Sequence, residues 1–213
     1  MSPRTPLQFE EIREGKRSLI MDVALEHFAN EGYKSTTISH IARHAGISKG
    51  LMYNYFESKE KLLSEIIDRS VGEISLYFDP DKDGYLSEEE FELFIRKTFF
   101  LLREKRSFWR LFYQLLMQKD VRDQFLKSYI GSGGSFPSID NNRSTSFFKQ
   151  YSKLIEEYFI RKKEHKPAGY DPMIDLNMFI YLTEGFSMVT AYLDEINEEY
   201  FEKTVNRIIE LYK

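Results

Sequence analysis

Apolar side chains recur along most of the chain with the spacing of α-helices. Within residues 10–30, and again within residues 60–77, apolar residues return about every three to four positions, so each stretch has one apolar face. Strict alternation of apolar and polar residues, which is typical of β-strands, is nearly absent. The six prolines leave long intervals in which a helix can run unbroken. The pattern predicts an all-α protein.

Turn and capping residues divide these stretches into separate helices. Gly32 predicts the end of the first helix, and Thr37 and Ser58 are candidate N-caps. Ser87 and Glu90 fit a capping box, which predicts another helix start. The glycine-rich segment 131–142 predicts a loop. Further helices are predicted at residues 106–118, 121–130, 143–163, 172–193 and 198–212.

The segment TISHIARHAGISKGLMYNYF, residues 37–56, has the pattern of a helix-turn-helix, in which a tight turn containing glycine joins two short helices. Its apolar residues would form the inner face: Ile41, Ala42, Ala45, Ile47, Met52 and Phe56. The outer residues would be Ser39, His40, Arg43, Ser48, Lys49, Leu51, Tyr53, Asn54 and Tyr55. Hydroxyl, amide and basic side chains of this kind suit contacts with the phosphates and base edges of DNA. A helix-turn-helix that is only structural is the alternative.

A longer segment around this motif resembles a known family. Residues 32–66, GYKSTTISHIARHAGISKGLMYNYFESKEKLLSEI, are similar to the N-terminal domain of TetR-type transcriptional repressors. The resemblance rests on TTI, the Ala-Gly-Ile turn, SKGLMYNYF and the SKEKLL that follows. It implies a helix-turn-helix DNA-binding domain at residues 1–58, a connecting helix at 59–78, and a ligand-binding and dimerisation domain at 79–213.

The resemblance also implies which residues meet DNA, with residues 49–55 as the recognition helix. The residues that the resemblance places at phosphates are Thr37, Tyr53, Tyr55 and Lys59. Those that it places at base edges are Ser39, Lys49, Leu51 and Asn54. Leu51 can offer a base only an apolar contact, for instance to a thymine methyl group. The expected DNA-binding residues are Thr37, Ser39, Ser48, Lys49, Leu51, Tyr53, Asn54, Tyr55 and Lys59.

His40 and His44 lie four positions apart on one face of the second predicted helix. A zinc site of the HExxH type would need a glutamate directly after the first histidine, where Ile41 stands. We therefore expect histidines that face phosphate or simply lie exposed.

The acidic segment YFDPDKDGYLSEEEF, residues 77–91, matches the calcium-binding loop of an EF-hand. Gly84 stands where that loop turns sharply, and apolar residues flank it on both sides. An ordinary turn followed by a capping box is the alternative, because Glu90 can serve in either. Residues 79–90 are therefore a candidate calcium site. Its expected ligands are Asp79, Asp81, Asp83, the backbone carbonyl of Tyr85, Ser87 and Glu90.

Aromatic residues are abundant in the predicted helices after this loop. A pocket lined by them would suit a hydrophobic ligand. The candidate pocket residues are Phe99, Phe108, Trp109, Phe112, Tyr113, Met117, Phe148 and Tyr151. A second apolar stripe consists of Met178, Leu182, Gly185, Val189 and Leu193. Together with part of residues 143–163, it resembles the four-helix dimer interface of the TetR family. Core packing within one subunit is the alternative for that stripe.

Composition and charge narrow the class of protein. With 42% apolar and 30% charged residues, the chain has the composition of a globular protein. Its net charge of −4 argues against coating nucleic acid by bulk charge, so DNA binding requires a local basic patch. The chain has no cysteine, which excludes disulfides and thiolate metal sites. Neither a signal peptide nor a membrane span is recognisable, which predicts a cytoplasmic protein without a membrane partner.

These observations favour a transcriptional regulator over an enzyme. No nucleophile–base pair, phosphate-binding loop or metal–histidine set is recognisable, so we expect no catalysis. The leading hypothesis is a homodimeric repressor that binds a double-stranded DNA operator and is released by a small hydrophobic effector. It requires no cofactor, and calcium is a candidate ligand. The alternative is a calcium sensor or buffer that uses residues 79–90.

Overall fold

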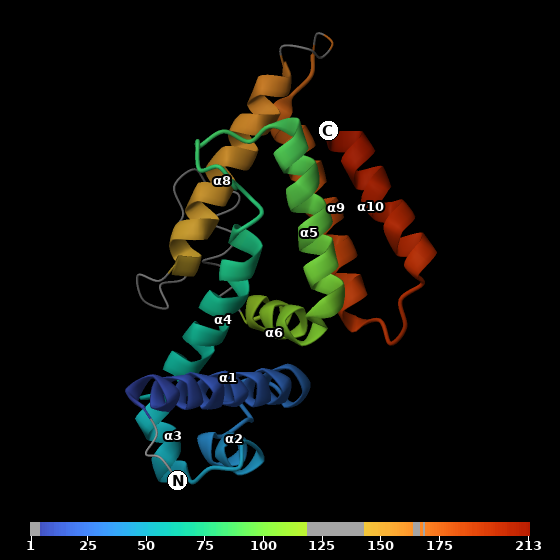
Figure 1. Ribbon diagram of the computed structural model, residues 1–213. Helices are drawn as coiled ribbons and strands as arrows, with labels where there is room; N and C mark the ends of the chain where they lie inside the picture. The colour runs from blue at the N-terminus through green and yellow to red at the C-terminus, as the bar shows by residue number, and fades with distance from the viewer. Residues whose placement is uncertain (1–4, 119–142, 164–166, 168) are drawn as a thin grey trace. The chain divides into compact units, whose positions relative to one another are not determined.

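A computed structural model describes residues 5–118, 143–163, 167 and 169–213, with residues 143–149 described only by their backbone. Every regular element in that part of the chain is α-helical (Figure 1), which confirms the all-α prediction. The predicted helix 121–130 and the predicted loop 131–142 lie outside the described residues. The helices are α1 (Pro6–Glu31), α2 (Ile38–His44), α3 (Lys49–Tyr55), α4 (Lys59–Ser75), α5 (Glu88–Glu104), α6 (Arg106–Leu116), α8 (Arg143–Lys162), α9 (Pro172–Tyr192) and α10 (Glu198–Tyr212).

The predicted capping residues begin their helices as expected. Thr37 accepts a hydrogen bond from the His40 amide, and Ser58 accepts one from the Lys61 amide. Ser87 and Glu90 form the predicted capping box: the Ser87 hydroxyl accepts from the Glu90 amide at 3.1 Å, and the Glu90 carboxylate accepts from the Ser87 amide at 2.9 Å. Each bond satisfies a backbone amide that the first turn of a helix leaves unpaired.

The chain forms two compact units, Met1–Ile67 and Asp68–Lys213, and the division falls within α4. In the N-terminal unit, α1 packs against α2, and α2 against α3. The α1 helix ends at Gly32, whose φ of +89° places it in a region that residues with a Cβ atom rarely adopt. The fully buried residues of this unit are Ile20, Ala24, Phe28, Ile41, Ala42, Met52, Phe56, Leu62 and Ile66.

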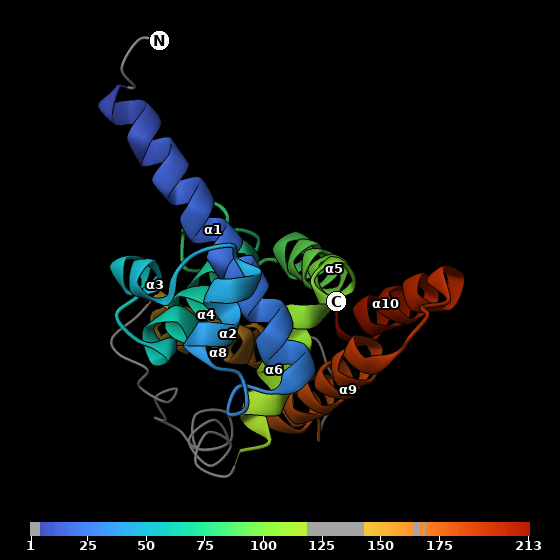
Figure 2. The same cartoon turned by 90° about the horizontal axis from the view of Figure 1, so that it is seen from below.

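In the C-terminal unit, α9 is the central helix and packs against α5, α6, α8 and α10. Figure 2 shows α9 and α10 side by side. Aromatic rings fill the space between these helices. Phe91 stacks on Tyr158 with centroids 4.5 Å apart, and Phe179 lies 5.5 Å from Phe159. The aromatic richness of the sequence thus supplies the core of this unit.

None of the helices in the described residues has both the length and the apolar character that crossing a membrane requires.

Candidate DNA-binding surface, ligand cavity and acidic loop

The α3 helix presents one face to its own unit and the other to solvent. Met52 and the following Phe56 are buried and hold α3 on the core. On the opposite side, Lys49 and Asn54 are exposed, Leu51 is 40% exposed and Tyr53 is 47% exposed. This surface combines an ammonium, an amide, a phenol and an apolar side chain. Such a set can contact both phosphates and base edges.

Polar residues at the two helix starts have structural contacts of their own. Ser48 caps α3, its hydroxyl accepting from the Leu51 amide at 3.1 Å, and Thr37 caps α2 in the same way. Ser39 is exposed, whereas Tyr55 is half-buried. Because capping leaves Ser48 and Thr37 near exposed backbone amides, both positions remain candidates for phosphate contacts.

Lys59, at the start of α4, forms hydrogen bonds with the segment between α1 and α2. Its ammonium donates to the carbonyl oxygens of Tyr33 and Thr36, at 2.8 and 3.1 Å, and lies 4.4 Å from the centre of the Tyr33 ring. An ammonium has three donors, so one is left after these two bonds. A phosphate contact by Lys59 stays a prediction, now alongside a structural role.

Two basic residues of α1 hold the helix-turn-helix in place, and the sequence analysis missed both. The Arg17 guanidinium donates to the Tyr55 carbonyl oxygen at 3.1 Å, pairs with the Glu65 carboxylate and lies over the Phe56 ring. The Lys16 ammonium donates to the Ala45 carbonyl oxygen at 3.1 Å. These contacts depend on how α1 crosses the later helices, which local sequence spacing does not reveal.

A cavity of about 80 Å³ lies inside the C-terminal unit. Its lining includes five of the predicted pocket residues, namely Phe99, Phe108, Trp109, Phe112 and Tyr151. Of the other predicted residues, Tyr113 contacts the lining residue Glu184, whereas Met117 is 57% exposed and does not line the cavity. The side chain of Phe148 lies outside the described residues.

Two polar groups interrupt the apolar wall of this cavity. The Glu184 carboxylate accepts a hydrogen bond from the Tyr113 hydroxyl at 3.0 Å, and burial raises the pKa of the Glu184 carboxyl. The Thr98 hydroxyl is buried and has no hydrogen-bond partner among the described residues. An apolar cavity with a few polar groups is the usual form of a small-molecule site. Sequence reasoning missed Glu184 and Thr98 because neither forms part of a recognisable motif.

The acidic loop brings together part of the predicted calcium-ligand set. Asp79, Asp81 and Asp83 each place a carboxylate oxygen within 4.8 Å of the others. Asp79 is buried. Its Oδ2 accepts a hydrogen bond from the side-chain amide of Gln150 at 3.3 Å. Its Oδ1 has no hydrogen-bond partner in the described part of the chain. Gly84 turns the chain with a φ of +76°.

The other predicted ligands of the loop have different contacts. Glu90 and Ser87 bond to each other in the capping box of α5. The Tyr85 ring lies under the Arg161 guanidinium, 4.0 Å from its carbon to the ring centre. The loop geometry therefore contains a cluster of three aspartates, with Glu90 engaged at the helix start.

Comparison with known proteins identifies the N-terminal unit. Residues 20–66 match the family of bacterial regulatory proteins described as the tetR family, and the match covers α2, α3 and most of the buried residues named above. The chain is therefore a helix-turn-helix transcriptional regulator whose residues 20–66 are similar to the tetR family. That result agrees with the resemblance in residues 32–66.

Relatives and solved structures extend the similarity to the rest of this regulator. An uncharacterized HTH-type transcriptional regulator of Bacillus subtilis (strain 168), YhgD, is 26% identical over 190 residues, covering 81% of this chain and 97% of that protein. The fatty acid metabolism regulator protein of the same organism is 34% identical over 84 residues, 39% of this chain and 43% of that protein. The crystal structure of FadR from Bacillus subtilis in complex with stearoyl-CoA has a TM-score of 0.65 at 20% identity, covering 92% of this chain and 97% of FadR. These relatives are regulators, and the FadR likeness extends the shared fold over the C-terminal unit.

Proposed function

We propose that this TetR-type regulator is a repressor that leaves its operator when a small hydrophobic ligand enters the cavity of the C-terminal unit. The observation that carries the proposal is the apolar, aromatic cavity with Glu184 and Thr98 in its wall. The fatty acid metabolism regulator and the FadR complex with stearoyl-CoA support a fatty acyl chain as the ligand class. Such a repressor would act in the cytoplasm and need no cofactor.

The size of the cavity implies a conformational change on binding. Its volume of about 80 Å³ is well below the roughly 300–1,000 Å³ of pockets that hold drug-sized ligands. A long acyl chain would therefore have to separate the helices that line the cavity. A ligand can shift a conformational equilibrium only if it binds one conformation more tightly than the other. A cavity that is wide enough for the ligand in only one conformation produces this difference in affinity.

The ligand's polar end would meet the two polar groups of the wall. With its pKa raised by burial, the Glu184 carboxyl can hold its proton and donate a hydrogen bond to a carbonyl oxygen. The Thr98 hydroxyl can donate as well. Both groups would therefore favour an acyl carbonyl over an anionic head group.

The operator would be read by α3, with the expected DNA-binding residues in the roles that the TetR resemblance implies. We assign phosphate contacts to Tyr53 and Tyr55 and base contacts to Lys49 and Asn54. Two copies of α3 would bind the two halves of a near-palindromic site, because a two-fold dimer matches such a sequence.

Dimerisation would use the exposed apolar face of α9. Met178 and Val189 are 55% and 61% exposed, and Leu182 and Leu193 are exposed beside them. This face borders an open groove of about 580 Å³ whose other wall includes Tyr200 of α10. A large exposed apolar patch of this kind usually marks an interface.

The choice of the helix that accompanies α9 in this interface depends on how much of the apolar surface of α8 is buried. Four apolar residues of α8 are buried within the unit, so these four are not available for a partner subunit. The buried α8 residues are Leu154, Ile155, Tyr158 and Phe159. We therefore propose α9 and α10, rather than α9 and α8, as the helices that meet the second subunit.

Trp109 allows a direct test because it is the single tryptophan of the chain and lines the cavity. Stearoyl-CoA is added to the full-length protein while Trp109 fluorescence and the affinity for DNA from upstream of its own gene are measured. We expect a saturable change in fluorescence and a loss of DNA affinity of at least about ten-fold. Ser187→Phe, which fills the cavity, should weaken both responses, whereas Leu76→Phe, at an exposed position, should change neither.

Two outcomes would contradict the proposal in different ways. Absence of DNA binding at low salt by a folded dimer would remove the regulatory function itself. Retained DNA binding with no fluorescence response to acyl-CoAs of any chain length would remove the acyl ligand and leave the regulator.

Calcium binding by the acidic loop is a second candidate function, favoured by the buried Oδ1 of Asp79 that lacks a hydrogen-bond partner. Three carboxylates so close together repel one another, and a cation among them would relieve that repulsion. We expect millimolar calcium to raise the melting temperature of the wild type, and magnesium to do so much less. The comparisons point to regulators, so a stand-alone calcium sensor is not supported.

Glu90→Gln separates the calcium and capping roles of the loop. Glutamine can still accept the Ser87 amide bond and keep the cap, but it removes a charge that calcium would use. The variant should therefore lose most of the calcium response and little stability. An equal melting temperature with and without calcium in the wild type would show that the loop is only a turn and a cap.

A further inference from the structure

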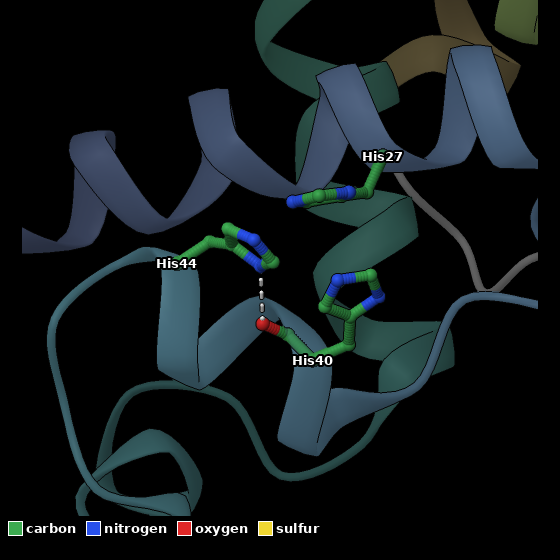
Figure 3. A group of neighbouring side chains, drawn as sticks. All are labelled: His27, His40 and His44. Carbon is green, nitrogen blue, oxygen red and sulfur yellow. Dashed lines mark hydrogen bonds between the residues drawn. The ribbon is translucent and has the colours of Figure 1, made fainter.

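Three histidines of the N-terminal unit face a common space. His27 comes from α1, and His40 and His44 come from α2 (Figure 3). Their ring centroids lie 4.4–4.5 Å apart, and one ring nitrogen of each lies within 4.8 Å of those of the other two. The side chains of His27 and His40 are only 17% and 27% exposed. His44 is exposed as expected and His40 is half-buried, and both belong to a cluster that includes a histidine of α1.

Each of these rings has an oxygen atom close to its Nδ1. His44 Nδ1 lies 3.0 Å from the His40 carbonyl oxygen, which can only accept, so Nδ1 of His44 carries the proton. His27 Nδ1 lies 2.7 Å from one oxygen of the Glu31 carboxylate, and His40 Nδ1 lies 3.3 Å from the other. With Nδ1 protonated in all three neutral rings, the lone pair is on Nε2.

Glu31 is suited to orient two of the rings. One oxygen of its carboxylate accepts from the Nδ1–H group of His27, and the other oxygen faces Nδ1 of His40. Metal-bound histidines characteristically donate their second N–H to a carboxylate or a backbone carbonyl. His27 and His44 have such a hydrogen-bond partner, and a Glu31 oxygen lies 3.3 Å from Nδ1 of His40.

We propose that His27, His40 and His44 bind one divalent transition-metal ion of the zinc type through Nε2, with Glu31 as a positioning residue. Imidazole nitrogen is a preferred ligand of Zn²⁺, and three protein ligands leave a fourth position for water. A tetrahedral ion with bonds of about 2.0–2.1 Å would place its ligand atoms about 3.4 Å apart, so small side-chain rotations would close the site.

A bound ion would join α1 to α2, because the three ligands come from both helices. Binding to the folded state alone stabilises that state by mass action. Zinc would therefore fix the α1–α2 packing on which α3 is mounted. The site belongs to the N-terminal unit, whereas the cavity and the acidic loop belong to the C-terminal unit.

Calorimetric titration of the full-length protein with Zn²⁺ near pH 7.5 tests the site without relying on DNA binding. We expect one ion per chain and a raised melting temperature, with Co²⁺ giving visible absorption typical of nitrogen ligation. His44→Gln should lower the zinc affinity by at least about ten-fold, and Glu31→Gln by roughly 10–100-fold, as loss of an orienting carboxylate usually does. His44 is exposed, so its substitution is compatible with folding, which circular dichroism checks.

Two controls separate this site from other groups that bind metal. His165→Gln removes the remaining histidine of the chain and should leave the zinc affinity unchanged. Asp81→Asn with Asp83→Asn weakens the acidic loop and should also leave it unchanged. Zinc binding that survives His27→Gln combined with His44→Gln would overturn the proposal. So would a wild type that is stabilised by inorganic phosphate but not by Zn²⁺, which would indicate protonated histidines that bind anions.

Discussion

Glu184 places a carboxyl group in the wall of an apolar cavity, next to the hydroxyl of Tyr113. Burial penalises the charged form, so the pKa of Glu184 is raised above its ordinary value of 4.5, and burial also raises the pKa of Tyr113. A carboxyl group with a perturbed pKa in the wall of a cavity is a candidate for a ligand contact. The same burial makes the stability of the protein depend on pH.

Glu184→Gln should therefore stabilise the protein increasingly as pH rises above about 4.5. Above that pH the unfolded chain has lost the proton that the folded chain still holds, so the free energy of unfolding of the wild type falls as pH increases. The fall ends once pH exceeds the raised pKa of the folded state. Glutamine cannot ionise and still accepts the Tyr113 bond. Melting temperatures of both proteins between pH 4.5 and 8 measure the effect, and a constant difference across that range would contradict it.

Two neighbouring residues of α3 should differ in what they contribute to DNA binding. Tyr53→Phe should weaken binding to all sequences by a similar factor, because a phosphate contact carries no sequence information. Asn54→Ala should relax the preference at one base position, with a discrimination loss of about 1–3 kcal/mol. Binding to a set of single-base operator variants distinguishes the two. A change of base preference in Tyr53→Phe would show that the assigned roles are wrong.

At the scale of elements, short helices depend on a long one. The α2 and α3 helices have seven residues each, too few to be stable alone, and they are held by contacts from α1. Arg17 is one such contact, since it bonds to the end of α3 and pairs with α4 through Glu65. The orientation of the recognition helix therefore rests on a residue that touches no DNA in the proposed function.

Arg17→Met should destabilise the N-terminal unit by about 1–3 kcal/mol, because it leaves the Glu65 carboxylate and the Tyr55 carbonyl without their charged donor. Faster amide hydrogen exchange in α3 would report this loss locally. Arg13→Met, on the exposed side of the same helix, is the matched control and should have no such effect. Equal exchange rates in both variants would show that the contacts of Arg17 with Tyr55 and Glu65 do not stabilise α3.

At the scale of the whole molecule, the proposed dimer depends on the exposed face of α9. Val189→Glu should convert a dimer into a monomer, because a buried charge without a partner is costly in an apolar interface. Leu76→Glu places the same charge at an exposed site outside this face and should leave the dimer intact. Sedimentation equilibrium measures the mass of each. If Val189→Glu is still a dimer, α9 does not form the interface.

Local sequence patterns determined the helices of this protein and several of their ends. Helical spacing, Gly32 and the caps Thr37, Ser58 and Ser87 act within a few residues of one another, so the sequence predicts them without knowledge of the fold. The helix-turn-helix can also be predicted from the sequence, because its pattern spans only about 20 neighbouring residues. Its inner residues Ile41, Ala42, Met52 and Phe56 are buried as expected.

Only the tertiary structure decided which distant side chains meet. His27 joins His40 and His44, Arg17 reaches Tyr55, and Glu184 meets Tyr113 through packing between separate helices, so sequence spacing does not reveal these contacts. For the apolar residues of α8 and α9 too, the sequence does not reveal which of them are buried. Their periodicity is similar, yet α8 buries Leu154, Ile155, Tyr158 and Phe159 in the unit, while α9 leaves Met178 and Val189 exposed. Periodicity identifies an apolar face, whereas the neighbouring helices determine whether that face is covered.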